Sequence, residues 1–425
     1  MSLLISNIKS LVHTEDNPKI KYSGKEMSRL NCIEEAYLLV HGDEIHDFGK
    51  SDSDTLARLR NENRGIQELD AKGGTLMPGW IDSHTHIVFA GSREKEFTDR
   101  IKGLSYEEIA LRGGGILNSA ERLRKASEPE LLESAARRLK EVAMLGTVAL
   151  EIKSGYGLSP ESELKMLRVI KKLAESGPLA IRSTFLGAHA VPSEFKGNKK
   201  EYISVLIREV MPEIQKHGLA EFCDVFCEQN YFSADETKEI LEAAKAHGML
   251  PKVHAEQLSH SGGIKAGIMS GAVSVDHLEF ANEEDIRMLA DSETIPVVLP
   301  GAQFFLGLKN PPVRKMIEAG CAVALSSDYN PGSCPSGNMN QMVSLACIMY
   351  KMTPDEAIIA ATTNSARAIG LSEKYGSICR GKKASFFITQ AIPTYNFLPY
   401  AFGSNLIDTV VINGKSVSKN ELYKF

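Results

Sequence analysis

Hydrophobic and polar positions change their spacing twice along this chain of 425 residues. Up to residue 77, short apolar runs are separated by polar, Gly-containing turns, a pattern typical of strands. The clearest strand candidates of this stretch are 3–5, 36–40 and 75–77. We expect the three histidines of the stretch, His13, His41 and His46, to lie on the surface.

Between Gly79 and about residue 376, short apolar runs alternate with longer amphipathic segments. This alternation is the pattern of parallel βα units. The predicted strands are 79–84, 147–152, 180–188, 222–227, 250–255, 273–277, 295–299 and 321–327. The predicted helices include 128–144, 160–176, 199–217 and 235–247. Ser159 and Ser233 stand at the starts of two of them, as N-cap residues do.

Eight parallel strands with intervening helices predict an α/β protein with a (β/α)₈ TIM-like barrel. A doubly wound open sheet is the structural alternative, but no GxGxxG fingerprint follows an early strand. After residue 376 helical spacing stops, and two strands are predicted at 384–389 and 408–414, the second with an Asn-Gly hairpin turn. We therefore expect a small β domain built from residues 1–77 and 377–425, and a catalytic barrel of residues 78–376.

Composition narrows the classes of function. A formal net charge of −5 argues against nucleic-acid binding, because no basic face stands out. Seven scattered cysteines without a CxxC pair fit a reducing compartment better than a disulfide framework. No apolar run approaches the ~18 residues of a membrane span, and no signal-peptide pattern opens the chain. We expect a cytoplasmic protein without a membrane or nucleic-acid partner.

Polar residues capable of metal binding or proton transfer follow several predicted strands. A (β/α)₈ barrel carries its reactive groups at the carboxyl ends of its strands. His84 and His86 are two residues apart, so they point to the same face of the first strand. The other candidates at strand ends are His189, His254, His277 and Asp328.

The most economical interpretation is one metal ion per chain. The expected ligands are His84, His86, His254 and Asp328. Three imidazoles, one carboxylate and a water suit Zn²⁺ or iron as Fe²⁺/Fe³⁺. The metal would generate hydroxide at neutral pH, and His277 and Asp328 would share the proton transfer. A two-metal site bridged by a carbamylated lysine is the alternative, but Lys153 follows strand two rather than strand four.

Two further stretches point to an anionic, planar ligand. Arg93 lies one short loop after the histidine pair, and a guanidinium binds carboxylates through a planar fork of donors. Tyr156 offers a hydroxyl between two glycines at the end of strand two. The segment Arg112 to Gly115 lies between strands one and two, and we expect it to act as a lid.

The residues that end these strands resemble those of the amidohydrolase superfamily. The resemblance runs through nearly the whole chain, in PGWIDSHTH (78–86), FAGSRE (89–94), EIKSGYG (151–157), LGAH (186–189), HAEQ (254–257), SDYNPGS (327–333) and PYAFG (399–403). It implies hydrolysis of the ring amide of 4-imidazolone-5-propanoate to N-formimidoyl-L-glutamate, the third step of L-histidine degradation. The substrate contacts it implies are Arg93, Tyr156, His189, Asn330, Gly332 and Ser333. It also makes a homodimer plausible.

Two other functions remain open at this point. Related deaminases often carry a glutamate three residues after the strand-five histidine, as a proton donor to the ring. This chain has Gln257 there, which cannot transfer a full proton at neutral pH. We therefore interpret Gln257 as a substrate ligand and keep the deaminase of an aminated heterocycle as the alternative. A barrel that has lost catalysis would be expected to have lost a ligand, and all four are present.

Overall fold

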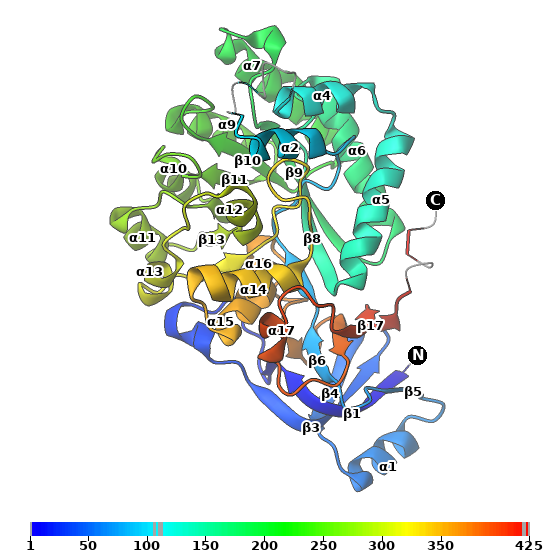
Figure 1. The fold of residues 1–425 in the computed structure, drawn as a ribbon. Helices are drawn as coiled ribbons and strands as arrows, with labels where there is room; N and C mark the ends of the chain where they lie inside the picture. Colours follow the sequence, from blue (N-terminus) through cyan, green and yellow to red (C-terminus); the bar gives the residue numbers. More distant parts are fainter. Residues whose placement is uncertain (1, 105–107, 109–113, 419–421, 424–425) are drawn as a thin grey trace.

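A ring of eight parallel strands forms the centre of the structure, a computed structural model that describes residues 2–104, 108, 114–418 and 422–423 (Figure 1). The strands pair in chain order, from β7 to β14. They are β7 (Trp80–Asp82), β8 (Thr147–Lys153), β9 (Ala180–Ala188), β10 (Phe222–Cys227), β11 (Leu250–Ala255), β12 (Ser274–His277), β13 (Ile295–Val298) and β14 (Ala324–Leu325). The predicted barrel is confirmed, and the open-sheet alternative is wrong.

Hydrogen bonds between the residues that follow β7 and β14 close the ring. The Asp328 amide donates to the His84 carbonyl (3.1 Å), and the His86 amide donates to the Tyr329 carbonyl (2.9 Å). The buried Asp82 carboxylate accepts from the Ser327 hydroxyl (2.5 Å) and from the Ser326 hydroxyl. The closure therefore places the ends of strands one and eight side by side.

Helices surround this ring, and no helix among the described residues is long and apolar enough to cross a membrane (Figure 1). The helices of this region are α2 (Glu94–Ile101), α4 (Ile116–Lys125), α5 (Glu128–Met144), α6 (Pro160–Ser176), η2 (Ser193–Phe195), α7 (Lys199–Val205), η3 (Leu206–Val210), α8 (Met211–His217), α9 (Ala234–Ala246), α10 (Gly263–Met269), α11 (Glu283–Ala290), α12 (Pro300–Leu306), α13 (Val313–Glu318), α14 (Met339–Tyr350), α15 (Pro354–Ile359), η4 (Ala360–Asn364) and α16 (Ser365–Ala368).

The predicted starts of α6 and α9 are confirmed. The Ser159 hydroxyl accepts a hydrogen bond at the start of α6, and Ser233 forms a capping box with Glu236 at the start of α9. The helix predicted over 199–217 is interrupted by the π-helical turn η3. Pro212 follows that turn and has no backbone N–H to donate, which interrupts the regular ladder of helical hydrogen bonds.

Strands from both ends of the chain form a second sheet beside the barrel, so the blue and the orange to red segments lie together (Figure 1). Its strands are β1 (Ser2–Val12), β3 (Cys32–His41), β4 (Glu44–Lys50), β5 (Gln67–Asp70), β6 (Thr75–Pro78), β16 (Phe386–Thr389), β17 (Ile407–Ile412) and β18 (Lys415–Ser416). The remaining elements of the two terminal regions are β2 (Thr14–Glu15), η1 (Gly24–Ser28), α1 (Ser53–Glu62), β15 (Ile378–Cys379) and α17 (Phe397–Tyr400).

A turn in the second sheet and a buried tryptophan show how the sequence forms this arrangement. Asn413 and Gly414 turn the chain between β17 and β18 with φ of 50° and 76°, as the predicted Asn-Gly hairpin requires. Trp80 at the start of the barrel is fully buried and packs on Phe387 of the second sheet, with ring centroids 5.1 Å apart. The barrel and the second sheet therefore share apolar core.

The prediction that His13, His41 and His46 lie on the surface is wrong for His13, which is 1% exposed. His46 is exposed and His41 is partly buried. Burial lowers the pKa of His13 to about 4, against the opposing effect of Glu15. Its ring lies within 3.4 Å of the hydroxyls of Thr362 and Thr363 in η4. These partners come from more than 340 residues away, so local polarity could not indicate them.

Candidate active site

The histidine pair follows β7, which pairs in parallel with β8. A Cβ on Gly79 would lie 2.2 Å from the Val148 side chain, so only glycine allows this approach. Beyond β7, the Lys153 amide donates to the Thr85 carbonyl (2.9 Å), which fixes the backbone between the two histidines. The Nε2 atoms of His84 and His86 are 3.3 Å apart.

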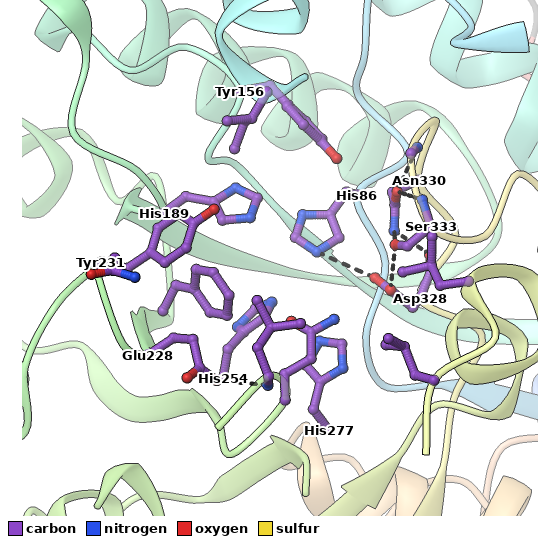
Figure 2. A pocket seen from close by; sticks show the side chains of 18 of the residues that line it. His86, Tyr156, His189, Glu228, Tyr231, His254, His277, Asp328, Asn330 and Ser333 are labelled. Carbon is purple, nitrogen blue, oxygen red and sulfur yellow. Dashed lines mark hydrogen bonds and ion pairs between the residues drawn. The ribbon is translucent and has the colours of Figure 1, made fainter. Parts of the chain in front are cut away.

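His254 at the end of β11 completes a cluster of three buried imidazoles. One ring nitrogen of each of the three lies within 4.8 Å of the others. Asp328 faces the same point, since its Oδ1 is 3.6 Å from the Nε2 atoms of both His84 and His86. Figure 2 shows the ring of His86 directed at the carboxylate of Asp328.

Asp328 is held by the loop that follows it. The Ser333 hydroxyl donates to Asp328 Oδ2 (2.9 Å), and the Asn330 amide donates to the Ser333 hydroxyl (2.6 Å). These bonds leave Oδ1 directed at the imidazoles. Asp328 has φ of 59°, a left-handed conformation that costs a non-glycine residue free energy and is frequent at functional sites.

The donor set fits a divalent metal ion. Buried imidazole nitrogens and a carboxylate oxygen converge within a few ångströms, an arrangement that a shared cation stabilises. Burial, followed by the Lys153 ammonium, holds the pKa of His84 well below its ordinary value. Burial and the neighbouring His189 and His254 do the same to the pKa of His86. Neutral imidazoles are the form that binds a metal.

His277 lies beside this cluster at the end of β12. Its ring centroid is 5.6 Å from that of His84, and its φ of 89° is again left-handed. Burial lowers the pKa of His277, but the Glu279 carboxylate, 3.5 Å from its Nδ1, reverses this, and the net shift is upward. Glu279 accepts a hydrogen bond from the buried Gln303 amide. A histidine held in this way can take up and release a proton.

A cavity of about 650 Å³ opens above the imidazoles (Figure 2). Tyr156 and His189 line one side, and the ring of His189 stacks on that of His86 at 5.6 Å. Burial lowers the pKa of His189 to about 3 and raises that of Tyr156, so both side chains face a ligand uncharged. The guanidinium of Arg93 donates through Nε and Nη2 to Glu96, at 2.9 and 2.5 Å.

The cavity brings together all but one of the residues predicted for the site. Those that line it are His86, Arg93, Tyr156, His189, His254, Gln257, His277, Asp328, Asn330, Gly332 and Ser333. His84 lies deeper, with 0% exposure. A Cβ on Gly332 would lie 2.4 Å from Arg93 Nη1, so this glycine lets the guanidinium pack against the loop. Arg112 and Gly113 of the expected lid lie outside the described residues.

Several lining residues were not predicted, among them Glu96, Arg100, Phe226, Glu228 and Tyr231. Glu228 directly follows β10, so the rule that strand ends carry function could have identified it. Glu96 is three residues after Arg93 on α2, a spacing that indicates an ion pair. Arg100, whose Nη2 donates to the Gly332 carbonyl (3.0 Å), had no comparable signal.

Lys153 forms ion pairs with two buried carboxylates. Its Nζ is 2.7 Å from Asp224 and 2.9 Å from Glu151, both fully buried carboxylates. Burial opposes the charge of this amine, but the two carboxylates outweigh it and raise the pKa of Lys153. Carbamylation needs a neutral amine, so this contact set favours the single-metal interpretation.

Comparison with known proteins agrees with this fold. Residues 75–417 match the model of the amidohydrolase family. The chain therefore belongs to the amidohydrolase family. Similar solved structures include Escherichia coli guanine deaminase, with a TM-score of 0.73, 15% identity, and coverage of 98% of this chain and 99% of that one. An adenosine deaminase from Xanthomonas campestris has a TM-score of 0.70 at 16% identity, covering 100% and 94%. At these identities the likeness concerns the fold alone.

Curated relatives place the chain more narrowly. An imidazolonepropionase of Christiangramia forsetii is 54% identical over 98% of this chain and 100% of its own length. That of Flavobacterium johnsoniae is 52% identical over the same shares, and that of Geobacillus kaustophilus is 43% identical over 98% and 97%. Within the amidohydrolases, the chain belongs with the imidazolonepropionases.

Proposed function

We propose that this chain hydrolyses the ring amide of 4-imidazolone-5-propanoate to N-formimidoyl-L-glutamate, in the third step of L-histidine degradation. The observation that carries the proposal is the convergence of three buried imidazoles and Asp328 on the floor of a cavity that Arg93 and Tyr156 line. The relatives named imidazolonepropionase, similar over nearly their full length, support the same reaction.

One Zn²⁺ or iron ion per chain is part of this proposal. Its ligands would be His84, His86, His254 and Asp328. A metal bound by such donors lowers the pKa of a coordinated water toward ~7 and so supplies a nucleophile at neutral pH. The chain contributes neutral imidazoles, an oriented carboxylate and burial, because all four residues are no more than 3% exposed.

The substrate's propanoate and ring need separate partners. Arg93 and Tyr156 would bind the carboxylate, since a carboxylate leaving water needs charged or polar donors. His189 and Gln257 would hydrogen-bond the ring, and the loop of Asn330, Gly332 and Ser333 would contact substrate or product. All seven residues line the cavity, which supports these assignments.

Ring opening also requires proton transfer to the departing nitrogen. His277 and Asp328 would share this task as general base and acid. The upward shift in the pKa of His277 and its contact with Glu279 support a role in which it accepts a proton near neutral pH. Burial raises the pKa of Asp328 as well, against the effects of His277 and Ser333, which supports a part for this carboxylate in the proton transfer.

The deaminase alternative shares the fold and the ligands. It is less supported, because Gln257 lines the cavity where a carboxyl would be needed as proton donor. Incubation of the purified chain with 4-imidazolone-5-propanoate decides between the two. The product expected by NMR is N-formimidoyl-L-glutamate without release of ammonia, and guanine and adenosine should be left intact. Ammonia from either purine would favour the deaminase.

The division of the chain, its location and its assembly complete the proposal. A small β domain of residues 1–77 and 377–425 and a barrel of residues 78–376 are proposed, which the two separate sheets support. Seven free cysteines support a cytoplasmic location. Tyr400 and Phe402 are 79% and 54% exposed, which supports a homodimer. Light scattering at micromolar concentration would test the homodimer.

A further inference from the structure

Below the imidazole cluster, five buried ionisable side chains form a network to which the proposed reaction gives no role. Its members, each 0% exposed, are Glu151, Lys153, Asp224, Lys252 and Asp276. Lys153 lies at its centre, with Nζ 2.7 Å from Asp224 Oδ2, 2.9 Å from Glu151 Oε1 and 3.5 Å from Asp276 Oδ2. One ammonium thus contacts three carboxylates in the buried interior of the barrel.

Two of these carboxylates also contact candidate metal ligands. Asp276 Oδ2 is 2.6 Å from Nδ1 of His84, and Asp224 Oδ2 is 2.9 Å from Nδ1 of His254. The other oxygen of Asp224 accepts from the backbone amide of His254 (3.1 Å). An ionised carboxylate only accepts hydrogen bonds, so each contact favours the tautomer that carries its proton on Nδ1. The Nε2 lone pair is then free for a metal.

The network needs its ammonium groups for this arrangement to persist. Three carboxylates buried together repel one another, so without a cation between them their side chains would move apart. Lys252 forms an ion pair with Glu151, whose Oε2 is 2.6 Å from the Lys252 Nζ. Lys153 is the residue that contacts both Asp224 and Asp276. It therefore links the partner of His254 to the partner of His84.

We propose that Lys153 is a positioning residue for the metal site. It holds Asp224 and Asp276 in place, and these two carboxylates in turn orient the rings of His254 and His84 toward one point. The inference rests on the proposed metal-binding role of these histidines and does not depend on the identity of the substrate. Lys153 itself lies below the ligands and contacts no reacting atom.

The test replaces Lys153 by methionine, which keeps the length of the side chain and removes its charge. In metal-free Lys153→Met, ¹⁵N NMR of the histidine rings should show His84 and His254 losing the single Nδ1–H tautomer of the wild type. Zinc affinity, measured by chelator competition, should fall about 10- to 100-fold, the range for lost ligand partners. With saturating metal, kcat should fall more than KM changes. Wild-type tautomers and affinity in the folded variant would overturn the proposal.

Lys382→Met is the matched control. Lys382 is 1% exposed, donates to the Ser377 hydroxyl (2.7 Å) and lies 3.8 Å from Glu15, so it is also a buried lysine in a polar cluster. It contacts none of the three imidazoles, and its loss should leave zinc affinity and ring tautomers unchanged. A fall in zinc affinity equal to that of Lys153→Met would mean that general destabilisation, not positioning, weakens the site.

Substitution of each aspartate by the isosteric asparagine tests the proposal even when the Lys153→Met variant does not fold. Asp276→Asn should alter the His84 tautomer and Asp224→Asn that of His254, each with about tenfold weaker zinc binding. Where the double variant folds, Lys153→Met combined with Asp224→Asn should lose less zinc-binding free energy than the sum of the losses in the two single variants. The reason is that both changes act on His254. Full additivity, or unchanged tautomers in both amide variants, would overturn the proposal. A wild-type chain that binds no zinc at these histidines would instead refute the proposed metal site.

Discussion

Replacement of Arg93 by alanine tests how the chain recognises the substrate's carboxylate. The Arg93 guanidinium lies at the cavity wall, and its Nε and Nη2 both donate to Glu96 Oε2. Glu96 Oε1 in turn accepts from the Gly115 amide (3.0 Å). Both side chains are 14% exposed. Arg93→Ala therefore removes a cation and also leaves the Glu96 carboxylate without its ion-pair partner beside the cavity.

The expected loss of kcat/KM in Arg93→Ala follows from these two effects. A hydrogen bond to a charged group contributes about 1.5 to 3 kcal/mol, which corresponds to a fall of roughly 10- to 160-fold in kcat/KM. The uncompensated Glu96 repels an anionic substrate, so the loss should lie in the upper half of that range. Adding Glu96→Gln to Arg93→Ala should recover part of it, because the repulsion is removed. Arg93→Lys should retain only part of the wild-type kcat/KM, since lysine keeps the charge but lacks the planar fork of donors.

The assay compares kcat/KM for 4-imidazolone-5-propanoate with that for an imidazolone lacking the carboxylate. The neutral compound should be nearly indifferent to Arg93→Ala. Arg122→Ala serves as the matched control, because Arg122 donates to the Ser92 carbonyl (3.3 Å) from α4 and is not among the residues that line the cavity. Equal losses for the two compounds would refute the assignment of Arg93 to the carboxylate.

Three further changes test the ligands, the proton transfer and the buried His13. His254→Ala should remove most bound metal together with the activity, and full metal occupancy by elemental analysis would show that His254 is not a ligand. His277→Ala should lower kcat by ~10²- to 10⁴-fold with metal content unchanged, whereas loss of metal would make His277 a ligand. Because burial lowers the pKa of His13 to about 4, its contribution to stability is present above pH ~6.5 and is lost as the pH falls toward 4. Between pH 7.5 and pH 5 the unfolding free energy of the wild type should fall by about 2 kcal/mol more than that of His13→Gln. The measurement is urea unfolding at the two pH values, and equal shifts of the urea midpoint in both proteins would contradict this prediction.

The sequence predicted the elements whose signals are local. The bounds of α5, α6, β9, β10 and β11 agree with the prediction, because helical periodicity, caps and β-branched apolar runs are properties of neighbouring residues. The eighth strand was predicted over seven residues, but β14 has two, since the chain there leaves the ladder to form the hydrogen bonds that close the ring.

The sequence indicated which residues at strand ends lie together, but it did not indicate the buried side chains that contact them. The fold rule places His84, His86, His254 and Asp328 on one edge, so spacing and strand order were enough. The partner of His84, Asp276, is 192 residues away, and only the closed barrel brings the two together. Buried polar networks depend on tertiary contacts of this kind, which explains why the prediction placed Lys153 at strand two without identifying its three carboxylate partners.

A titration of the metal-free chain tests the central claim, a hydrolase that depends on one metal ion per chain. Zinc or iron(II) is added stepwise, and the initial rate of N-formimidoyl-L-glutamate formation from 4-imidazolone-5-propanoate is measured at each step. The rate should rise linearly and stop rising at one metal equivalent per chain. A break at two equivalents, or full activity in the chelated chain before any metal is added, would contradict a single metal ion held by His84, His86, His254 and Asp328.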